Sequence, residues 1–130
     1  MRRRRALAVA VMLIALAGCG SSTSAIELVT AQEAAATLQD NTPEIVLDVR
    51  TPEEFAEGHI AGAVNVDYYA ADFSSQLEAL DPDASYVLYC RSGNRSAETA
   101  KLMTDLEFTS VDEIDGGILA WLDAGLPLAR

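Results

Sequence analysis

One cysteine of this sequence lies in a short segment whose residue types can make a thiol reactive. A loop of this composition can point several backbone N–H groups at the sulfur and place a helix N-terminus beside it, and both features favour an anion. The glycine in the segment gives the backbone access to the positive φ angles that a tight turn requires. The pattern therefore predicts a thiolate nucleophile. The segment consists of Cys90, Arg91, Ser92, Gly93, Asn94, Arg95 and Ser96.

Two arginines in the same segment add positive charge to a chain that is otherwise acidic. The sequence contains 20 acidic and 9 basic residues, for a formal charge of −11 at pH 7. Four of the basic residues are the consecutive arginines at positions 2–5, so the rest of the chain holds five. Arg91 and Arg95 are two of those five, and their charge would lower the pKa of a neighbouring thiol further.

The same residues have plainer interpretations. Cys90 could be a buried, unreactive cysteine that behaves as a small apolar side chain. Each arginine could form a surface ion pair, and this is expected more of Arg91 than of Arg95, because adjacent loop residues need not both face inward. The combination of arginines, glycine and loop position favours the reactive interpretation.

The composition restricts the other kinds of site. The chain has 130 residues, of which 50% are apolar and 22% charged, which is typical of one globular domain. The acidic balance argues against nucleic acid as a partner, because phosphate binding needs a basic surface. One histidine and two well-separated cysteines leave little material for a metal site or a disulfide framework. We therefore expect no metal and no nucleic-acid partner.

The elements that must position the reactive segment follow from the hydrophobic pattern. From Ile26 onward, strand patterns alternate with helix patterns, which predicts a parallel sheet with helices on both faces. Cys90 follows one of these strands directly, and in open parallel sheets functional sites lie beyond the carboxyl ends of the strands. The predicted strands are residues 26–29, 45–49, 63–66, 86–89 and 111–114.

Helices are predicted between these strands from their starts and their apolar faces. Thr30 with Glu33 forms a capping box, and Thr51 before Pro52 marks a second capped start. Further helices are expected over residues 74–80, after Gly93 and over 118–123. In the helix after Gly93, helical spacing predicts a buried face made of Thr99, Leu102, Met103 and Leu106.

Three segments of the chain resemble the signatures of a single-domain rhodanese, the sulfurtransferase family. Together they span nearly all of residues 26–130, in the order in which the family has them. The first is Asp48-Val49-Arg50 followed by Glu54-Phe55 and Glu57-Gly58-His59-Ile60-Ala61-Gly62-Ala63-Val64-Asn65, the second is Cys90 to Ser96, and the third is Asp115-Gly116-Gly117-Ile118-Leu119-Ala120-Trp121 followed by Gly125-Leu126-Pro127.

The resemblance implies an α/β class, rhodanese-like three-layer α/β/α fold with a five-stranded parallel sheet. It implies that the Cys90 thiolate takes a sulfane sulfur from a small thiosulfate-like donor, carries it as a persulfide and passes it to a thiophilic acceptor such as cyanide. It implies neither a metal nor an organic cofactor. The residues expected to bind the donor are Arg91, Ser92, Gly93, Asn94 and Arg95, and those expected to support the site are Asp48, Arg50 and Ser96.

Other functions compete with this interpretation. A cysteine and a histidine can form a protease-type pair, but the resemblance places His59 in a structural turn. A cysteine phosphatase typically has Cys-x5-Arg, whereas four residues separate Cys90 from Arg95 here. A thioredoxin-like protein would carry Cys-x-x-Cys, which is absent. The chain could also be a non-catalytic rhodanese-like binding module, or a persulfide carrier that serves a protein partner. Trp121 is expected in the core.

The first residues predict export. The arginines at positions 2–5 precede an apolar segment, residues 6–17, that as a helix would be about 18 Å long, too short for the roughly 30 Å hydrocarbon core of a membrane. The segment ends in Leu16-Ala17-Gly18-Cys19, which resembles a bacterial lipobox with Cys19 as the lipidated residue. The alternative is ordinary signal cleavage near Ala17, which would leave Cys19 free.

The predicted organisation is therefore a signal peptide over residues 1–18, a lipidated cysteine with a flexible tether over 19–25, and a rhodanese domain over 26–130. Without the first 18 residues, 5 basic residues face 20 acidic ones, a formal charge of −15. Such a chain does not bind an anionic membrane surface by charge, so the lipid alone would hold it there. The expected location is the extracytoplasmic side of a bacterial membrane.

Overall fold

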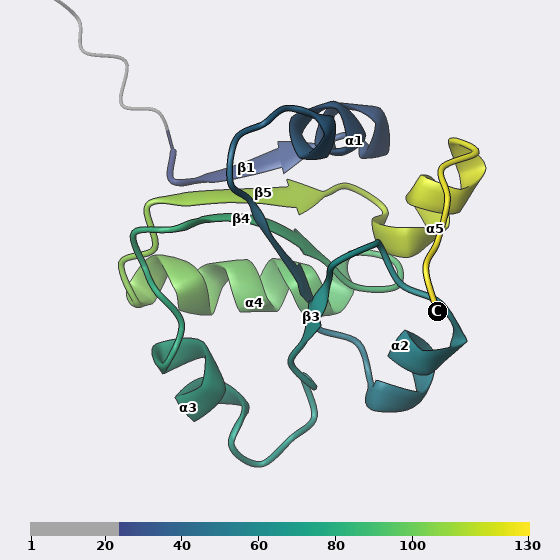
Figure 1. Ribbon diagram of the computed structural model, residues 1–130. Coiled ribbons are helices and arrows are strands. Elements are labelled where there is room, and N and C mark those ends of the chain that lie inside the picture. Colours follow the sequence, from purple (N-terminus) through teal and green to yellow (C-terminus); the bar gives the residue numbers. More distant parts are fainter. Residues whose placement is uncertain (1–23) are drawn as a thin grey trace, which may run out of the picture.

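Five parallel strands form a single sheet in the order β1-β5-β4-β2-β3 (Figure 1). The computed structural model describes residues 24–130, so the predicted signal peptide and Cys19 lie outside the described residues. The predicted parallel sheet is confirmed, and its central strand β4 leads directly to Cys90. The strands are β1 Ile26–Val29, β2 Ile45–Asp48, β3 Val64–Asn65, β4 Ser85–Tyr89 and β5 Ser110–Ile114.

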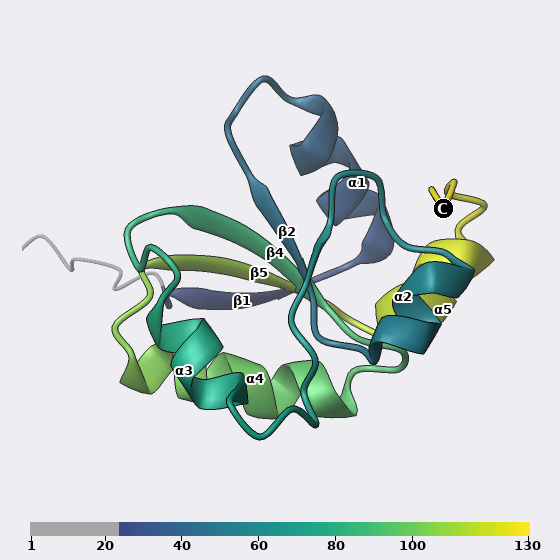
Figure 2. The same cartoon turned by 60° about the horizontal axis from the view of Figure 1, so that its bottom comes forward.

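Helices cover both faces of the sheet. Helices α3 and α4 lie on one face, and α1 and α5 lie on the other (Figures 1 and 2). The short helix α2 runs beside α5 (Figure 2). This confirms the three-layer α/β/α class predicted from the sequence. The helices are α1 Ala31–Gln39, α2 Pro52–Glu57, α3 Phe73–Glu78, α4 Asn94–Asp105 and α5 Gly117–Asp123.

Local sequence signals explain where two of these helices begin. The Thr30 hydroxyl accepts a hydrogen bond from the backbone N–H of Glu33, whose carboxylate accepts one from the N–H of Thr30. The same reciprocal pair joins Thr51 to Glu54 at the start of α2, where Pro52 occupies the first helical position. Both predicted helix starts are therefore confirmed.

Strand β4 divides the core into two clusters. Its side chains alternate, so Tyr86, Leu88 and Cys90 pack on the face covered by α3 and α4, and Val87 and Tyr89 pack on the face covered by α1 and α5. The cysteine therefore lies on the same side of the sheet as α4, the helix that follows its own loop.

Trp121 of α5 belongs to the second cluster, as expected. Its side chain is buried, and its indole N–H donates a hydrogen bond of 2.9 Å to the carbonyl oxygen of Pro127. This bond satisfies the one polar group of a core tryptophan. It also holds the chain after α5 against the helix.

Two predictions about the elements need correction. The strand predicted over residues 63–66 is shorter, because only Leu47 and Asp48 of β2 offer it a partner at this edge of the sheet. Helical spacing predicts Leu102 on the buried face of α4, but it is 37% exposed. It lies at the border of the apolar stripe, beside the shallow hollow between α4 and α3, while Thr99 and Met103 are buried.

Among the described residues, no helix combines the length and the apolar character that crossing a membrane requires.

Candidate active site

The reactive segment forms the loop between β4 and α4 and the first turn of α4, at the carboxyl edge of the sheet. Cys90 follows the last residue of β4, and its side chain is 1% exposed. Gly93 precedes the first residue of α4 with a φ angle of 115°, in the left-handed region that its lack of a side chain allows. The turn at Gly93 brings the start of α4 back over the cysteine.

Two groups approach the cysteine sulfur at hydrogen-bond distance. The backbone N–H of Gly93 donates to Cys90 Sγ at 3.1 Å, and Ser96 Oγ lies 3.5 Å from the same sulfur. Burial raises the pKa of the Cys90 thiol, but the Ser96 hydroxyl and the N–H groups of Ser96, Gly93 and Ser92 outweigh it. The pKa of the thiol is therefore lowered, as the loop composition predicted.

The other side of the loop is bound to α5. The N–H of Ile118 donates to the carbonyl oxygen of Cys90 at 2.9 Å, and the N–H of Leu119 donates to that of Arg91 at 3.2 Å. Gly117, which begins α5, lies so close that a Cβ there would be 2.5 Å from the carbonyl oxygen of Cys90. The glycine therefore permits the contact that fixes the position of the cysteine.

A Gly117→Ala substitution is expected to move this loop. The added Cβ overlaps two backbone carbonyls, and overpacking of this kind costs about 1–3 kcal/mol. We expect a lower denaturation midpoint together with a slower alkylation of Cys90. Gly125→Ala is the matched control, because Gly125 also has a positive φ angle but a Cβ there would meet no neighbouring atom within 4 Å. Equal effects of the two substitutions on thiol reactivity would contradict the prediction.

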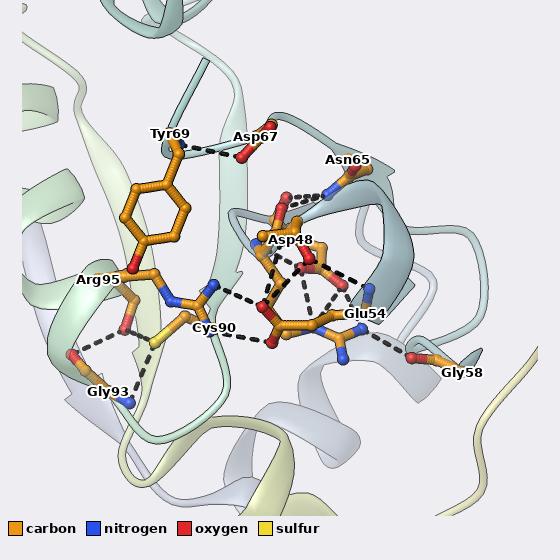
Figure 3. A network of polar contacts seen from close by, with 12 residues as sticks. Asp48, Glu54, Gly58, Asn65, Asp67, Tyr69, Cys90, Gly93 and Arg95 are labelled. Carbon is orange, nitrogen blue, oxygen red and sulfur yellow. Dashed lines mark hydrogen bonds and ion pairs between the residues drawn. The ribbon is translucent and has the colours of Figure 1, made fainter. Parts of the chain in front are cut away.

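Arg95 does not present a free guanidinium to the site. It forms a two-pronged ion pair with Glu54 of α2, at 2.8 Å and 3.0 Å, and lies over the ring of Tyr69 at 5.7 Å (Figure 3). The hydrogen bond from Arg95 lowers the pKa of the Glu54 carboxyl, against the effect of burial. The arrangement joins α4 to α2 and to the segment after β3.

The remaining loop side chains are exposed. Arg91, Ser92 and Asn94 all face the surface. Arg91 forms no ion pair with any described residue and lines a hollow of about 330 Å³ between α2 and α5. Its guanidinium is thus available to an anion, in contrast to that of Arg95. That residues 91–95 bind a donor stays a prediction.

Asp48 and Arg50 form a buried ion pair at the end of β2. The Arg50 guanidinium lies 2.7 Å from Asp48 Oδ2, and it also donates to the carbonyl oxygen of Gly58 at 2.7 Å. The Arg50 guanidinium carbon is 5.5 Å from the centre of the Tyr89 ring. The pair therefore ties β2 to α2 and β4, and that both residues support the site stays a prediction.

His59 makes its contacts within its own turn. Its Nδ1 is 2.9 Å from the carbonyl oxygen of Phe55, and its ring stacks on that of Phe55 at 3.8 Å. Its backbone N–H donates to the carbonyl oxygen of Ala129 at 3.0 Å, and the N–H of Ala129 donates to the carbonyl oxygen of His59 at 2.7 Å. The histidine therefore lies in the turn after α2, where the resemblance placed it, and holds that turn against the C-terminal segment.

Three neighbours of the loop were not predicted as site residues. Glu54 pairs with Arg95, Tyr69 covers Arg95, and Glu113 of β5 accepts a hydrogen bond from Ser96. A sequence signal existed only for Glu113, because an acidic residue inside a strand that must be buried on both faces is unusual. Ser96 itself was predicted to support the site, and it is fully buried between Cys90 and Glu113.

Comparison with known proteins identifies the family. A family model described as "Rhodanese-like domain" matches residues 30–124, which is more than half of the chain. The chain belongs to the rhodanese family. A rhodanese-related protein from Thermoplasma volcanium has the same fold, with a TM-score of 0.70 at 27% sequence identity over 79% of this chain and 97% of that one.

Rhodanese-family relatives named for sulfur transfer are similar over most of their length. Thiosulfate sulfurtransferase 16 of Arabidopsis thaliana is 40% identical over 91 residues, which cover 62% of this chain and 76% of the relative. Thiosulfate sulfurtransferase GlpE of Pseudomonas aeruginosa is 38% identical over 92 residues, which cover 70% of this chain and 80% of the relative. These relatives confirm the prediction of a sulfurtransferase, and Cys90 supplies its cysteine.

Proposed function

We propose that this rhodanese uses thiosulfate or a closely similar anion as its sulfur donor and forms a persulfide on Cys90. The observation that carries the proposal is the pair of polar groups on the sulfur: the N–H of Gly93 donates to it at 3.1 Å, and the Ser96 hydroxyl accepts from the thiol at 3.5 Å and can turn to donate to a thiolate. Both groups lie beside the sulfur before any substrate arrives. They stabilise an anion on sulfur, whether it is the thiolate or the terminal sulfur of a persulfide.

The reaction consists of two substitutions at sulfur. In the first, the Cys90 thiolate attacks the outer sulfur of thiosulfate, a new S–S bond forms, and sulfite leaves with the electron pair of the broken bond. In the second, a thiophilic acceptor such as cyanide attacks the outer sulfur of the persulfide, and Cys90 leaves as a thiolate. No net oxidation of the protein occurs, and two half-reactions predict ping-pong kinetics.

Arg91 is the side chain best placed to attract the donor. It is exposed and without an ion pair among the described residues, whereas the guanidinium of Arg95 is held by Glu54. The backbone around Gly93 provides the contacts closest to sulfur. Arg95 keeps its positive charge beside the thiolate, because the hydrogen bond with Glu54 raises the pKa of its guanidinium.

The test is mass spectrometry of the protein after incubation with thiosulfate under non-reducing conditions. We expect Cys90 to gain one sulfur atom and cyanide to remove it as thiocyanate. Mercaptopyruvate and an organic persulfide, tested in parallel, separate donor choice from sulfur transfer as such. An intact thiol with all three donors, in a folded protein, would refute the proposal and leave the binding module as the function.

We also propose that the protein is exported and held on the extracytoplasmic side of a bacterial membrane by a lipid on Cys19. The support is the sequence of residues 1–20. We expect Cys19→Ala to move the protein from the membrane fraction to the soluble fraction, because the acidic remainder has no affinity for an anionic surface. Cys90→Ala is the matched control, since it removes the other cysteine and leaves the anchor. Retention of the Cys19→Ala protein in the membrane fraction would contradict the proposal.

A further inference from the structure

A buried carboxylate without a cation lies next to the reactive cysteine. Glu113 is 7% exposed and sits in β5, with Leu28 of β1 and Leu88 of β4 as its strand neighbours. Among the described residues it forms no ion pair, whereas Asp48, the other buried acid, has Arg50. A buried ionised carboxylate without a partner is costly, so a group in this position favours its protonated form.

Ser96 connects this carboxylate to the cysteine. Its Oγ donates to Glu113 Oε1 at 2.9 Å and lies 3.5 Å from Cys90 Sγ. The same hydroxyl is 3.1 Å from the carbonyl oxygen of Gly93, which offers it a further acceptor. Because a hydroxyl has one hydrogen, its direction depends on which neighbour carries a charge.

When Cys90 and Glu113 together hold one proton, two arrangements give Cys90, Ser96 and Glu113 each a hydrogen-bond partner. With an ionised Glu113, the Ser96 hydroxyl donates to the carboxylate and the Cys90 thiol donates to Ser96 Oγ. With a protonated Glu113, the carboxyl donates to Ser96 Oγ and the hydroxyl donates to the Cys90 thiolate. The two arrangements differ only in where the proton resides, and neither leaves a buried polar group without a partner.

We propose that Glu113 holds, by way of Ser96, the proton that Cys90 gives up when it becomes a thiolate or an anionic persulfide. In this step the S–H bond breaks, Ser96 Oγ takes that proton and passes its own to Glu113 Oε1, and the serine ends unchanged. Ser96 and Glu113 are thus positioning residues, and the inference rests on the reactive thiol of the proposed function but not on the identity of the donor.

The surroundings of Glu113 support this assignment. It lines a cavity of about 440 Å³ together with Leu28 of β1, Gly93 and Ala97 near the start of α4, and Asp115 beyond β5. No basic side chain lines this cavity within the part of the chain that the structure describes. Burial raises the pKa of Glu113 and the charge of Asp115 adds to the effect, against the hydrogen bond from Ser96. The cavity gives the stored proton access to solvent.

The consequence is a coupled titration. Cys90 and Glu113 together hold two protons at low pH. The first proton lost belongs to the pair rather than to either residue, and loss of the second leaves a thiolate and a carboxylate on either side of one buried hydroxyl. The thiolate fraction should therefore rise in two steps as the pH increases. In Glu113→Gln, the amide N–H takes the place of the carboxyl proton and keeps the Ser96 hydroxyl directed at Cys90, so one step should remain.

The experiment measures the rate of Cys90 alkylation by iodoacetamide as a function of pH. The full chain carries Cys19→Ala, so that Cys90 is its only thiol. We expect two inflections for this protein and one for Glu113→Gln, with alkylation of the variant about 2-fold faster between them, because a proton shared evenly with Glu113 leaves about half of the parent's Cys90 protonated. Asp112→Asn is the matched control, because Asp112 precedes Glu113 in β5 and its side chain lies near Glu27 and Glu33 on the opposite face.

A second variant and a spectroscopic signal distinguish a Glu113 that holds the proton of Cys90 from a Glu113 with a merely structural role. In a Ser96→Ala background, Glu113→Gln should change the profile far less, because the hydroxyl link is gone. The infrared band of a protonated carboxyl group should disappear in Glu113→Gln, and in Cys90→Ser it should titrate at lower pH, because no second anion then opposes ionisation. A single inflection shared by the parent and Glu113→Gln, or a band independent of Cys90, would overturn the proposal even where thiosulfate transfer proceeds normally.

Discussion

Cys90→Ser is expected to lose sulfur transfer by about 10⁴-fold or to the background of the assay. The reaction passes through a covalent bond to the sulfur, and a serine hydroxyl is far from ionised at neutral pH, so it cannot attack a sulfane sulfur at a useful rate. Thiocyanate release in the presence of thiosulfate and cyanide measures turnover directly.

The fold of this variant should be unchanged, which makes the loss interpretable. Oxygen is smaller than sulfur, and the hydroxyl can still accept from the N–H of Gly93 and hydrogen-bond to Ser96. Circular dichroism and the denaturation midpoint supply the control. A variant that retained turnover while folding normally would place the sulfur-carrying group elsewhere, and the chemistry proposed for this loop would be wrong.

Arg50→Ala is expected to reduce the free energy of unfolding by about 3–5 kcal/mol. The Arg50 and Asp48 side chains are 6% and 0% exposed, so the variant leaves an isolated charge in the core. It also removes the donor to the carbonyl oxygen of Gly58, which joins the end of α2 to the sheet. Urea denaturation followed by tryptophan fluorescence reports the change through Trp121.

A surface pair provides the comparison for this variant. Lys101 and Glu98 lie 2.8 Å apart with side chains 71% and 56% exposed, and such pairs contribute less than about 1 kcal/mol. Lys101→Ala should therefore leave the denaturation midpoint almost unchanged. If Arg50→Ala and Lys101→Ala lowered the free energy of unfolding by similar amounts, Asp48 would have gained access to water or a proton on removal of Arg50.

The fold could be predicted from the sequence because its signals are local. Capping boxes at Thr30 and Thr51 involve residues three positions apart, and the central strands β2 and β4 are short segments made mostly of apolar residues. The misplaced Leu102 shows the limit of periodicity, because a helix position at the border of the apolar stripe is buried only if a neighbouring element covers it. Here α3 leaves that border open.

The candidate site could be predicted only in part, because sequence signals are local and several of its contacts join distant positions. Cys90, Gly93 and Ser96 lie within seven consecutive residues, and their types alone indicate a reactive thiol. The partners of the loop come from elsewhere: Glu54 is 41 positions from Arg95, and Glu113 is 17 from Ser96. Which carboxylate meets which loop residue depends on strand order and register, which hydrophobic patterns do not encode.

The burial of Cys90 also determines which molecules can reach it. A cysteine that is 1% exposed at the base of its loop is more accessible to a small, narrow reactant than to a folded protein or a bulky disulfide. For an enzyme exported as we propose, this difference in access by size protects the Cys90 thiol from large oxidants in an oxidising compartment. Small sulfur anions can exchange with the thiol, while large disulfides, which would trap it in mixed disulfides, remain outside.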